Sequence, residues 1–529
     1  MAYAIPNLLG GIPIGVLTDS YKAGHFRMYP DAIKMSAYGE FRKGFKKNNG
    51  EHDKADTRHI FYGIRYIVEN FMSKPWTMTD VENCDKFFKS HLAPFYTEYP
   101  WPRHLFEKFI KENDGYFPVK LEALPEGTVV NVHVPVYQIT AEKEYTPLCT
   151  FLETLLTMVW YPTTVATLSR RCKDVIERAF EQSVEPDQFF LLNSRLHDFG
   201  FRGCTCVEQS LIGGAAHMLS FDGTDTMSAA YYVQFGLNGG KVVGQSIPAT
   251  EHSVMTSWST ELEAVSNMVN QFGSGLYACV MDSYDYNEAL RSVLPAAKVV
   301  MEKKDPSGKG FLVIRPDSGD PVEAVLQGLQ ALEKVMGVTV NKLGYKVIKG
   351  AGVIQGDGIN IEMLEKIVEA CLKEKFSAQS VAFGMGGGLL QKVNRDTMSF
   401  ATKLSHIHLQ GQPAGRDLMK APKTDLGKFS LPGLLQVERN ADGVPMIYNV
   451  PDNGQGTPPV KAENNLLKVV YDMRPITSPS PWAGEHYFST VRDRAEKEWK
   501  AMAPYKAADP ISQDVAKDIQ DLRSAIHNN

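Results

Sequence analysis

The side chains in this sequence that could do chemistry lie mostly in short polar turns, each of which follows an apolar run. The turns carry these basic residues, aspartates and histidine: Arg202, Arg315, Lys392, Arg395, Asp225, Asp282, Asp317, Asp357 and His252. An arginine fork can hold phosphate oxygens through two parallel hydrogen bonds. Carboxylates beside such a site suit Mg²⁺ or ribose hydroxyls. The set therefore predicts a pocket for a sugar that carries more than one phosphate.

Two of the turns are rich in glycine, Gly356-Asp357-Gly358 and the segment from Gly384 to Gly388, and a helical pattern follows each. Backbone N–H groups at the start of a helix bind phosphate well, and glycine lets the anion come close. Taken alone, each turn is also typical of a tight connection between a strand and a helix. Their occurrence beside the basic residues favours a phosphate site.

Two aromatic residues, Phe199 and Tyr21, suit a different part of a ligand. A pyridine ring held flat by aromatic side chains gains about 0.5–1.5 kcal/mol for each stacked pair. Taken singly, Phe199 is typical of a core residue and Tyr21 of a surface or interface residue.

A repeated local pattern between about Leu191 and Arg395 must position these side chains. Seven times, an apolar run is followed by a turn containing Gly or Asp and then by a helical segment. Runs such as residues 311–314 and 380–383 are typical of strands buried on both faces. Such alternation implies a parallel sheet. Seven units are enough to close that sheet, so we expect residues 161–399 to form a βα barrel rather than an open sheet. In either topology the turns after the strands gather at one end.

Two of the expected helices carry clear start signals. Asp320 can cap a helix that has Pro321 at its first position, and Asn360 can cap a helix that begins at Ile361. The flanking regions, residues 1–160 and 400–529, differ from the middle of the chain. They predict a second domain that is rich in β-structure and partly helical, built from both ends of the chain.

Local patterns within the flanks support this second domain. Residues 117–140 alternate apolar and polar side chains around Pro125-Glu126-Gly127, and residues 429–450 contain a hairpin-like turn at residues 440–443. Residues 485–502 and 514–526 are helical by pattern.

Composition limits the partners of the chain. It has 529 residues and a formal net charge of −5 with both signs well mixed, so we expect neither nucleic acid nor a membrane as partner. Residues 1–11 lack the pattern of a signal peptide. The seven scattered cysteines are typical of reduced thiols, so we expect a cytoplasmic protein. His406 and His408 would share a strand face, but their spacing does not indicate a structural zinc.

Eight blocks of the sequence resemble those of the nicotinamide phosphoribosyltransferases, members of the type II phosphoribosyltransferase family. In order, they are Thr18–Lys22, Leu196–Gly203, Phe221–Thr226, Ser246–Ser253, Asp282–Asp285, Ile314–Gly319, Val353–Gly358 and Phe383–Asp396. The resemblance implies an irregular βα barrel of the type II kind and a homodimer whose active sites lie at the subunit boundary. It also implies an enzyme of NAD salvage that forms nicotinamide mononucleotide and diphosphate from nicotinamide and phosphoribosyl pyrophosphate.

The resemblance assigns four residues to the base. Phe199 would stack on one face of the pyridine, and Tyr21, with Asp19 nearby, would arrive from the partner subunit. Asp225 would accept a hydrogen bond from the carboxamide, and its charge would repel the carboxylate of nicotinic acid.

The resemblance places another group around the ribose. Arg315 and Asp317 would hold the pyridine and ribose sides, and Gly356 and Asp357 the ribose hydroxyls. Departure of Mg²⁺-bound diphosphate leaves positive charge on the ribose, and the pyridine nitrogen attacks the anomeric carbon. That nitrogen carries no proton, so catalysis should rest on positioning and charge stabilisation.

The phosphate groups would be held by residues near the second glycine-rich turn. Gly387 and Arg395 would cradle the 5′-phosphate, while Arg202 would face the diphosphate. His252 matches a family histidine that is phosphorylated transiently when ATP hydrolysis is coupled to synthesis, and Glu251 would orient it. We therefore expect Mg²⁺ as cofactor and ATP as a coupled energy source.

The sequence departs from the family in two places. The loop from Lys420 to Gly427 is shorter and less basic than in vertebrate members, and the C-terminus extends through residues 504–529.

Three other functions compete with this interpretation. A nicotinate phosphoribosyltransferase would need a cation where this chain has Asp225. A barrel glycoside hydrolase needs two carboxylates, but it needs neither four basic residues nor two glycine-rich turns. A non-catalytic binding protein on the same fold would not need a complete set of site residues.

Overall fold

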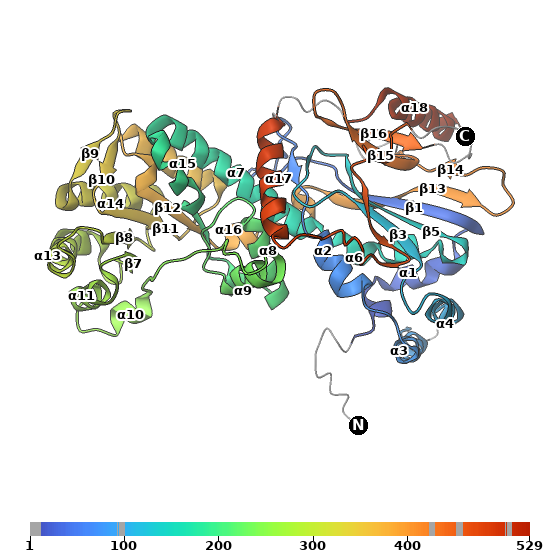
Figure 1. The fold of residues 1–529 in the computed structure, drawn as a ribbon, viewed down its shortest axis with the longest axis horizontal. Coiled ribbons are helices and arrows are strands. Elements are labelled where there is room, and N and C mark those ends of the chain that lie inside the picture. Colours follow the sequence, from blue (N-terminus) through green and yellow to red (C-terminus); the bar gives the residue numbers. More distant parts are fainter. Residues whose placement is uncertain are drawn as a thin grey trace. The chain divides into compact units, whose positions relative to one another are not determined.

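The computed structural model describes residues 12–92, 94, 101–422, 429–450, 459–502, 504 and 510–528. They form two compact units (Figure 1). The barrel unit comprises Val165–Asn394 and Phe488–Arg492, and the sheet unit comprises Met1–Thr164, Arg395–Tyr487 and Asp493–Asn529. Each unit has its own central sheet.

The barrel unit is built on a five-stranded parallel sheet in the order β6-β12-β11-β8-β7. Its strands are β6 (Leu196–Asp198), β12 (Val381–Met385), β11 (Ala351–Gln355), β8 (Phe311–Arg315) and β7 (Leu276–Val280). Every residue of β11 and β12 is buried, as the continuous apolar runs predict.

Two further segments close this sheet into an irregular barrel. Parallel bridges join Asp198 to Thr224, Gly223 to Gln245, and Ala249 to Ala278 in β7. The predicted βα barrel is therefore confirmed, but two of its seven expected strands are reduced to single bridges. Pro248 has no N–H group to donate, so the segment that contains it cannot extend a hydrogen-bonded ladder.

Helices lie outside the strands of the barrel unit (Figure 1). The longer ones are α7 (Trp160–Ser183), which begins in the sheet unit, α8 (Val207–His217), α11 (Glu261–Phe272), α13 (Leu294–Lys304), α14 (Pro321–Met336) and α15 (Ile361–Lys373). The predicted start signals are confirmed. Asp320 accepts hydrogen bonds from the N–H groups of Val322 and Glu323, both at 3.0 Å, and Asn360 accepts one from Met363 N at 2.9 Å.

The sheet unit contains a seven-stranded antiparallel sheet in the order β14-β13-β1-β5-β3-β17-β18. Its strands are β14 (Arg416–Asp417), β13 (Phe400–Leu409), β1 (Ala32–Phe41), β5 (Pro135–Glu142), β3 (Val119–Ala123), β17 (Lys468–Asp472) and β18 (Arg474–Pro475). β13 pairs with β1 and β17 pairs with β3, so strands from both ends of the chain form one sheet. The predicted β-rich domain built from both ends is thus confirmed.

The predicted hairpin is formed by β15 (Leu434–Arg439) and β16 (Pro445–Val450), with Asn440 N donating to Val444 O at 2.9 Å. The C-terminal helix α18 (Gln513–Asn528) packs against β16. Together these elements build a core cluster: Tyr38, Leu431, Leu435, Ile447, Val515 and Ile519. The C-terminal extension therefore completes the core of the sheet unit.

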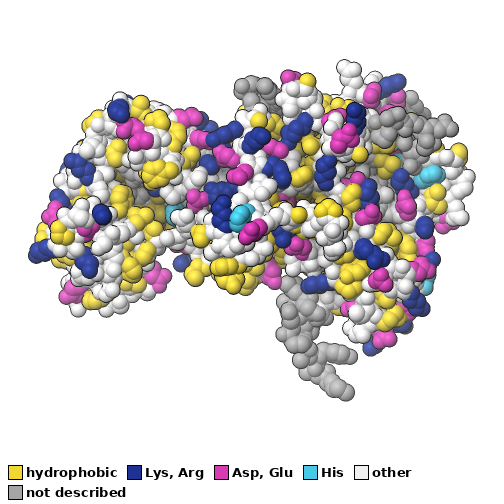
Figure 2. All heavy atoms as spheres, viewed as in Figure 1, with side chains coloured by type: hydrophobic (Ala, Val, Ile, Leu, Met, Phe, Trp, Pro, Cys, Tyr) yellow, Lys and Arg dark blue, Asp and Glu magenta, His cyan; other side chains and the backbone are white. Residues whose placement is uncertain are grey.

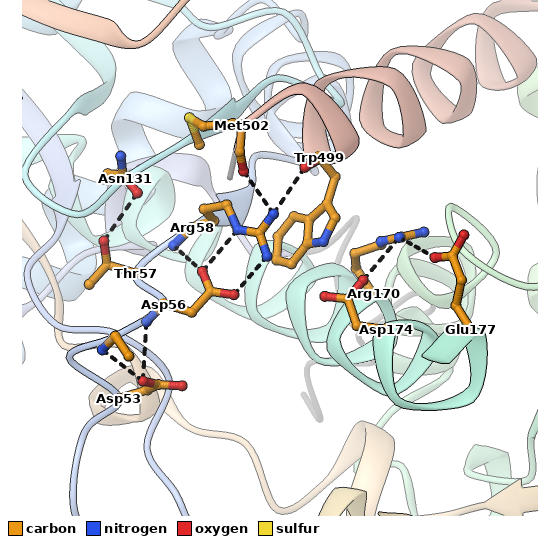
Figure 3. A network of polar contacts seen from close by, with 11 residues as sticks. Asp53, Asp56, Thr57, Arg58, Asn131, Arg170, Asp174, Glu177, Trp499 and Met502 are labelled. Atoms are coloured by element: carbon orange, nitrogen blue, oxygen red, sulfur yellow. Dashed lines mark hydrogen bonds and ion pairs between the residues drawn. The ribbon is translucent and has the colours of Figure 1, made fainter. Parts of the chain in front are cut away.

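A buried arginine ties the other C-terminal helix, α17 (Tyr487–Ala501), to the N-terminal part of the sheet unit (Figure 3). Arg58 Nη2 binds Asp56 Oδ2 at 2.8 Å, and Arg58 Nη1 donates to Trp499 O at 2.9 Å and to Met502 O at 2.8 Å. The guanidinium also lies 3.9 Å from the centroid of the Trp499 ring. One side chain thus satisfies carbonyls at the end of the helix, where no intrahelical donor is available.

Within the described residues, no helix combines the length and the hydrophobicity that are needed to cross a membrane.

Candidate functional site

Most of the predicted site residues lie in the barrel unit, in the turns at the carboxyl ends of its strands. These are Phe199, Arg202, Asp225, Glu251, His252, Asp282, Arg315, Asp317, Gly356, Asp357, Gly387 and Lys392. The remaining three, Asp19, Tyr21 and Arg395, belong to the sheet unit. The barrel therefore gathers most of the predicted groups at one end.

Two carboxylates, a histidine and an arginine form one connected group at this end. His252 Nε2 lies 3.2 Å from Asp282 Oδ1, and His252 Nδ1 lies 3.8 Å from Asp317 Oδ2. Arg315 Nη2 is 3.3 Å from the same Asp317 oxygen. Glu251, which we expected to orient His252, accepts a hydrogen bond from the Ser253 hydroxyl instead. In the structure the carboxylates beside the imidazole are thus those of Asp282 and Asp317.

Asp282 is the anchor of this group, because its side chain is only 2% exposed. Its Oδ2 accepts hydrogen bonds from Asp317 N at 2.8 Å and from the Ser318 hydroxyl at 2.5 Å. The carboxylate therefore fixes the turn after β8 as well as the His252 ring.

Asp225 is an exposed carboxylate that is fixed from two sides. The Ser246 hydroxyl donates to Asp225 Oδ1 at 2.5 Å, and Asp225 N donates to Asp198 O at 2.9 Å. Asp198 itself is fully buried, and burial raises the pKa of its carboxyl to about 6, although a hydrogen bond from Gly200 N opposes the shift. Asp225 is therefore positioned to accept a further hydrogen bond from a ligand.

The Phe199 ring lies against two glycines of neighbouring turns. A Cβ atom at Gly384 would be 1.9 Å from Phe199 Cε2, and one at Gly356 would be 3.1 Å from the same atom. Phe199 N also donates to Met385 O at 3.0 Å. Only glycine at position 384 lets the ring occupy this place at the strand ends.

The two glycine-rich turns lead into helices of very different length. The turn at Gly356 precedes the full helix α15, whereas the turn at Gly384 precedes α16 (Gly387–Leu390), which has four residues. The expected helix after the second turn is thus a single turn. It offers backbone N–H groups but little macrodipole, because the dipole grows from many aligned peptides.

Two of the predicted residues in the sheet unit lie near α1 (Ser20–Gly24), and the third lies at the unit's boundary. Tyr21 is 59% exposed and makes an edge contact with His25, with 5.1 Å between ring centroids. Asp19 Oδ2 accepts a hydrogen bond from the Thr154 hydroxyl at 2.9 Å. Arg395 is exposed and lies 3.9 Å from Asp396. In the barrel unit, Arg202 and Lys392 are likewise exposed.

Lys403 of the sheet unit, which was not predicted as a site residue, has both cations and carboxylates around it. Burial lowers the pKa of Lys403, and the nearby charges of Arg42 and Lys420 lower it further. Glu153 and Glu40 act in the opposite direction. Arg42 and Lys403 are far apart in the sequence, and the pairing of β13 with β1, which Arg42 directly follows, brings them near each other. The loop that follows Lys420 lies largely outside the described residues.

A cavity of 310 Å³ lies inside the barrel unit. It is lined by small or apolar side chains of the strands, including Val313, Ile354 and Ala382, and by polar residues that include His197 and Ser246. Burial lowers the pKa of His197, and Asp225 raises it. Neither His197 nor Ser246 was predicted as a site residue, although both stand inside motifs that were.

Comparison with known proteins identifies relatives of both units. Residues 194–452 match the nicotinate phosphoribosyltransferase (NAPRTase) family, and residues 13–121 match the nicotinamide phosphoribosyltransferase N-terminal domain. Two solved structures share the fold. Human nicotinic acid phosphoribosyltransferase is 17% identical, with a TM-score of 0.58 over 96% of this chain and 100% of that one. Nicotinate-nucleotide pyrophosphorylase from Pyrococcus furiosus is 14% identical, with a TM-score of 0.57 over 95% and 99%.

Curated bacterial proteins are closer in sequence. Nicotinamide phosphoribosyltransferase of Xanthomonas campestris is 40% identical over 430 residues, which are 80% of this chain and 87% of that protein. The protein of the same name from Acinetobacter baylyi is 31% identical over 457 residues, 80% of this chain and 88% of that one. The chain therefore belongs to the nicotinamide phosphoribosyltransferases of the NAPRTase family.

Proposed function

We propose that this chain joins nicotinamide to the anomeric carbon of phosphoribosyl pyrophosphate, forming nicotinamide mononucleotide and diphosphate for NAD salvage. The observation that carries the proposal is the fixed, exposed carboxylate of Asp225 next to the turn that holds Phe199. An anion held in this way accepts a hydrogen bond from a carboxamide NH₂ and repels a carboxylate. This favours nicotinamide over nicotinate as the base.

Phe199 supplies the surface on which the pyridine stacks. Its ring is backed by Gly356 and Gly384, so it cannot rotate toward those turns without a clash. A ring fixed before the substrate binds loses little conformational entropy on binding. With Asp225 holding the carboxamide, the pyridine nitrogen is turned toward the ribose.

The ribose and its phosphates are held by the neighbouring turns. Arg315 and Asp317 form an ion pair at the end of β8, and Gly356 and Asp357 follow β11 as candidate contacts for the ribose hydroxyls. The backbone around Gly387 binds the 5′-phosphate. As the bond to diphosphate breaks, positive charge develops on the ribose, and carboxylates close by stabilise it.

The diphosphate binds exposed cations. Arg202 and Lys392 in the barrel unit are exposed, as is Arg395. Mg²⁺ held by the diphosphate would neutralise part of its charge. Asp282 already accepts two hydrogen bonds and faces His252, which leaves Asp317 as the freer carboxylate toward such an ion.

His252 is the residue for ATP-coupled phosphorylation in this proposal. Asp282 and Asp317 flank its ring, and a carboxylate that binds one imidazole nitrogen fixes the direction in which the other points. The imidazole ring is therefore oriented before a phosphate group binds. We expect ATP to stimulate synthesis and His252→Ala to abolish the stimulation while leaving transfer without ATP in place.

A homodimer with shared active sites is part of the proposal. Met227, Tyr231 and Phe235 lie four residues apart along α9 (Met227–Tyr231) and the π-helical turn η7 (Tyr232–Leu237). They are 80%, 69% and 56% exposed, and Figure 2 shows hydrophobic side chains gathered around α9. Exposed apolar patches of this kind typically mark protein interfaces. A second copy of the chain is the occupant that the family's shared active site requires.

A direct assay tests the proposed function. The purified chain is incubated with phosphoribosyl pyrophosphate, Mg²⁺ and either nicotinamide or nicotinate at equal concentration, with and without ATP, and the mononucleotides are quantified by mass spectrometry. We expect nicotinamide mononucleotide as the main product. A preference for nicotinate would replace this function with that of a nicotinate phosphoribosyltransferase, and the absence of both products would favour a binding protein.

A further inference from the structure

Gln391 joins two turns that both belong to the candidate site. Its Nε2 donates to Gly200 O at 2.9 Å and contacts the Cys204 Sγ at 3.3 Å. The Cys204 thiol lies 3.5 Å from the same Gly200 carbonyl. At its own end, Gln391 N donates to Gly387 O at 3.1 Å. One residue therefore binds the turn after β6 through its side chain and the turn after β12 through its backbone.

The space around the Gln391 amide is tight at Gly203 and open enough for ordinary contact at Gly387. A Cβ atom at Gly203 would be 2.7 Å from Gln391 Oε1, and one at Gly387 would be 3.7 Å from it. Oε1 is itself buried and has no hydrogen-bond partner among the described residues. The side chain thus lies between two turns, with its donor used and its acceptor buried.

The two turns depend on each other beyond this contact. Phe199 N donates to Met385 O at 3.0 Å, and Gln209 Nε2, from α8, donates to Leu390 O at 3.1 Å. A Cβ atom at Gly200 would be 2.7 Å from Leu390 Cγ. The turn that carries Phe199 and Arg202 therefore lies directly on the turn that carries Gly387.

We propose that Gln391 is a positioning residue that sets the pyridine-stacking turn, residues 199–204, at a fixed distance from the phosphate-binding turn, residues 384–388. The proposal rests on the proposed function, because these turns hold the two ends of the product. Gln391 touches neither substrate. It acts by keeping Phe199 and Gly387 in register, so that base and 5′-phosphate are bound at the separation that the reaction requires. Small misplacements of this kind are costly for catalysis.

Three variants test the proposal. Gln391→Glu keeps the shape but loses the N–H donor, Gln391→Met loses both polar atoms, and Gly203→Ala pushes Oε1 away while leaving Gln391 in place. The matched control is Gln182→Glu, which removes the donor to the Tyr345 hydroxyl in the same unit. KM for each substrate, kcat and the exchange of backbone amides in residues 199–206 are measured for the full chain.

We expect each of the three variants to raise KM for both nicotinamide and phosphoribosyl pyrophosphate by about 10- to 100-fold. The amides of residues 199–206 should exchange faster, and the control should change neither quantity. The proposal would be overturned if both KM values stayed within two-fold of the wild type. This holds even if the thermal midpoint of unfolding falls, because Gln391 would then only stabilise the fold. The exchange measurement needs no activity. Faster exchange in a chain without transferase activity would therefore contradict the proposed function and leave the coupling of the turns in place.

Discussion

At the scale of single residues, the charge of Asp225 should decide which base the enzyme accepts. In Asp225→Asn the repulsion of a carboxylate is gone and the hydrogen bond to the carboxamide is weaker. We expect kcat/KM for nicotinamide to fall by about 10- to 100-fold and its advantage over nicotinate to shrink. Kinetics with both bases measure this. Asp320→Asn, which keeps a good helix cap, should leave the selectivity unchanged.

The buried carboxyl of Asp198 should make stability depend on pH. Burial raises its pKa from 3.8 to about 6, so the group stabilises the fold most when it is protonated. That contribution is full below pH 3.8 and is lost as the pH rises through about 6, by about 3 kcal/mol in total. Asp198→Asn should therefore gain stability relative to the wild type between pH 4 and pH 7, as followed by denaturant unfolding.

Asp305 supplies the contrasting case for this measurement. Hydrogen bonds from the Ser307 hydroxyl and from Gly310 N lower the pKa of its carboxyl. The stability that the ionised Asp305 carboxylate contributes is present above the ordinary pKa of an aspartate and is lost as the pH falls. Asp305→Asn should therefore lose stability relative to the wild type as the pH rises. The same trend in both variants would contradict the assignment for Asp198.

The gathering of most candidate site residues at one end of the barrel could be predicted from the sequence, but the contacts between them could not. The position of Asp225 and Asp317 after apolar runs was enough to predict that both reach one end of the barrel. The family resemblance implied that Glu251 orients His252, whereas in the structure Asp282, which follows the next strand, lies beside the ring. Gln391 was not predicted as a site residue, because its partner Gly200 lies in a turn far away in the sequence. Such pairs depend on strand order and register.

At the scale of elements, the turn after β12 should tolerate no side chain at Gly384. The added methyl group in Gly384→Ala would overlap the Phe199 ring, with only 1.9 Å between the atoms. We expect the ring to be displaced and nicotinamide binding, measured by calorimetry, to weaken by at least about ten-fold, since the stacking and the pocket shape are both lost. Gly275→Ala, where the nearest atom is 3.7 Å away, is the control. Unchanged binding in both variants would mean that Phe199 does not stack on the base.

The Arg58 contacts should stabilise the sheet unit. Arg58→Met removes the ion pair with Asp56 and the donors to Trp499 O and Met502 O. Breaking a buried pair by removing one partner costs about 3–5 kcal/mol. Arg474→Met is the control, because its pair with Asp114 is exposed and should contribute less than about 1 kcal/mol. Equal losses of unfolding free energy in the two variants would remove the special role of Arg58.

Local sequence signals were sufficient to predict the ends of helices and hairpin strands wherever those ends depend on residues close together in the sequence. The caps at Asp320 and Asn360 and the hairpin turn at residues 440–443 involve neighbours in sequence, and all three were predicted. The segments around Thr224 and Ala249 were expected as strands because their turns resemble the others. They form single bridges, since ladder formation depends on the curvature of the barrel and on Pro248, and no periodic pattern encodes that curvature.

At the scale of the whole molecule, the sheet unit joins strands from both ends of the chain in one sheet. β1 lies between β5 and β13, and β3 lies between β5 and β17. The alternation of apolar and polar residues predicted β-structure at both ends. It could not predict which strands pair, because any two edges with matching patterns are compatible until the register is fixed.

The shared active site gives the last prediction. Tyr21 belongs to the sheet unit and Phe199 to the barrel unit, and in the proposed homodimer each site takes Tyr21 from one subunit and Phe199 from the other. Chains with Tyr21→Ala or Phe199→Ala should each be nearly inactive. In a mixed dimer one site contains both aromatic residues and the other contains neither. Random assortment makes half of the dimers mixed, so co-expressed, differently tagged variants should recover about a quarter of the wild-type kcat. If the mixture is no more active than the separate variants, although mixed dimers are isolated, both residues act within one subunit and the site is not shared.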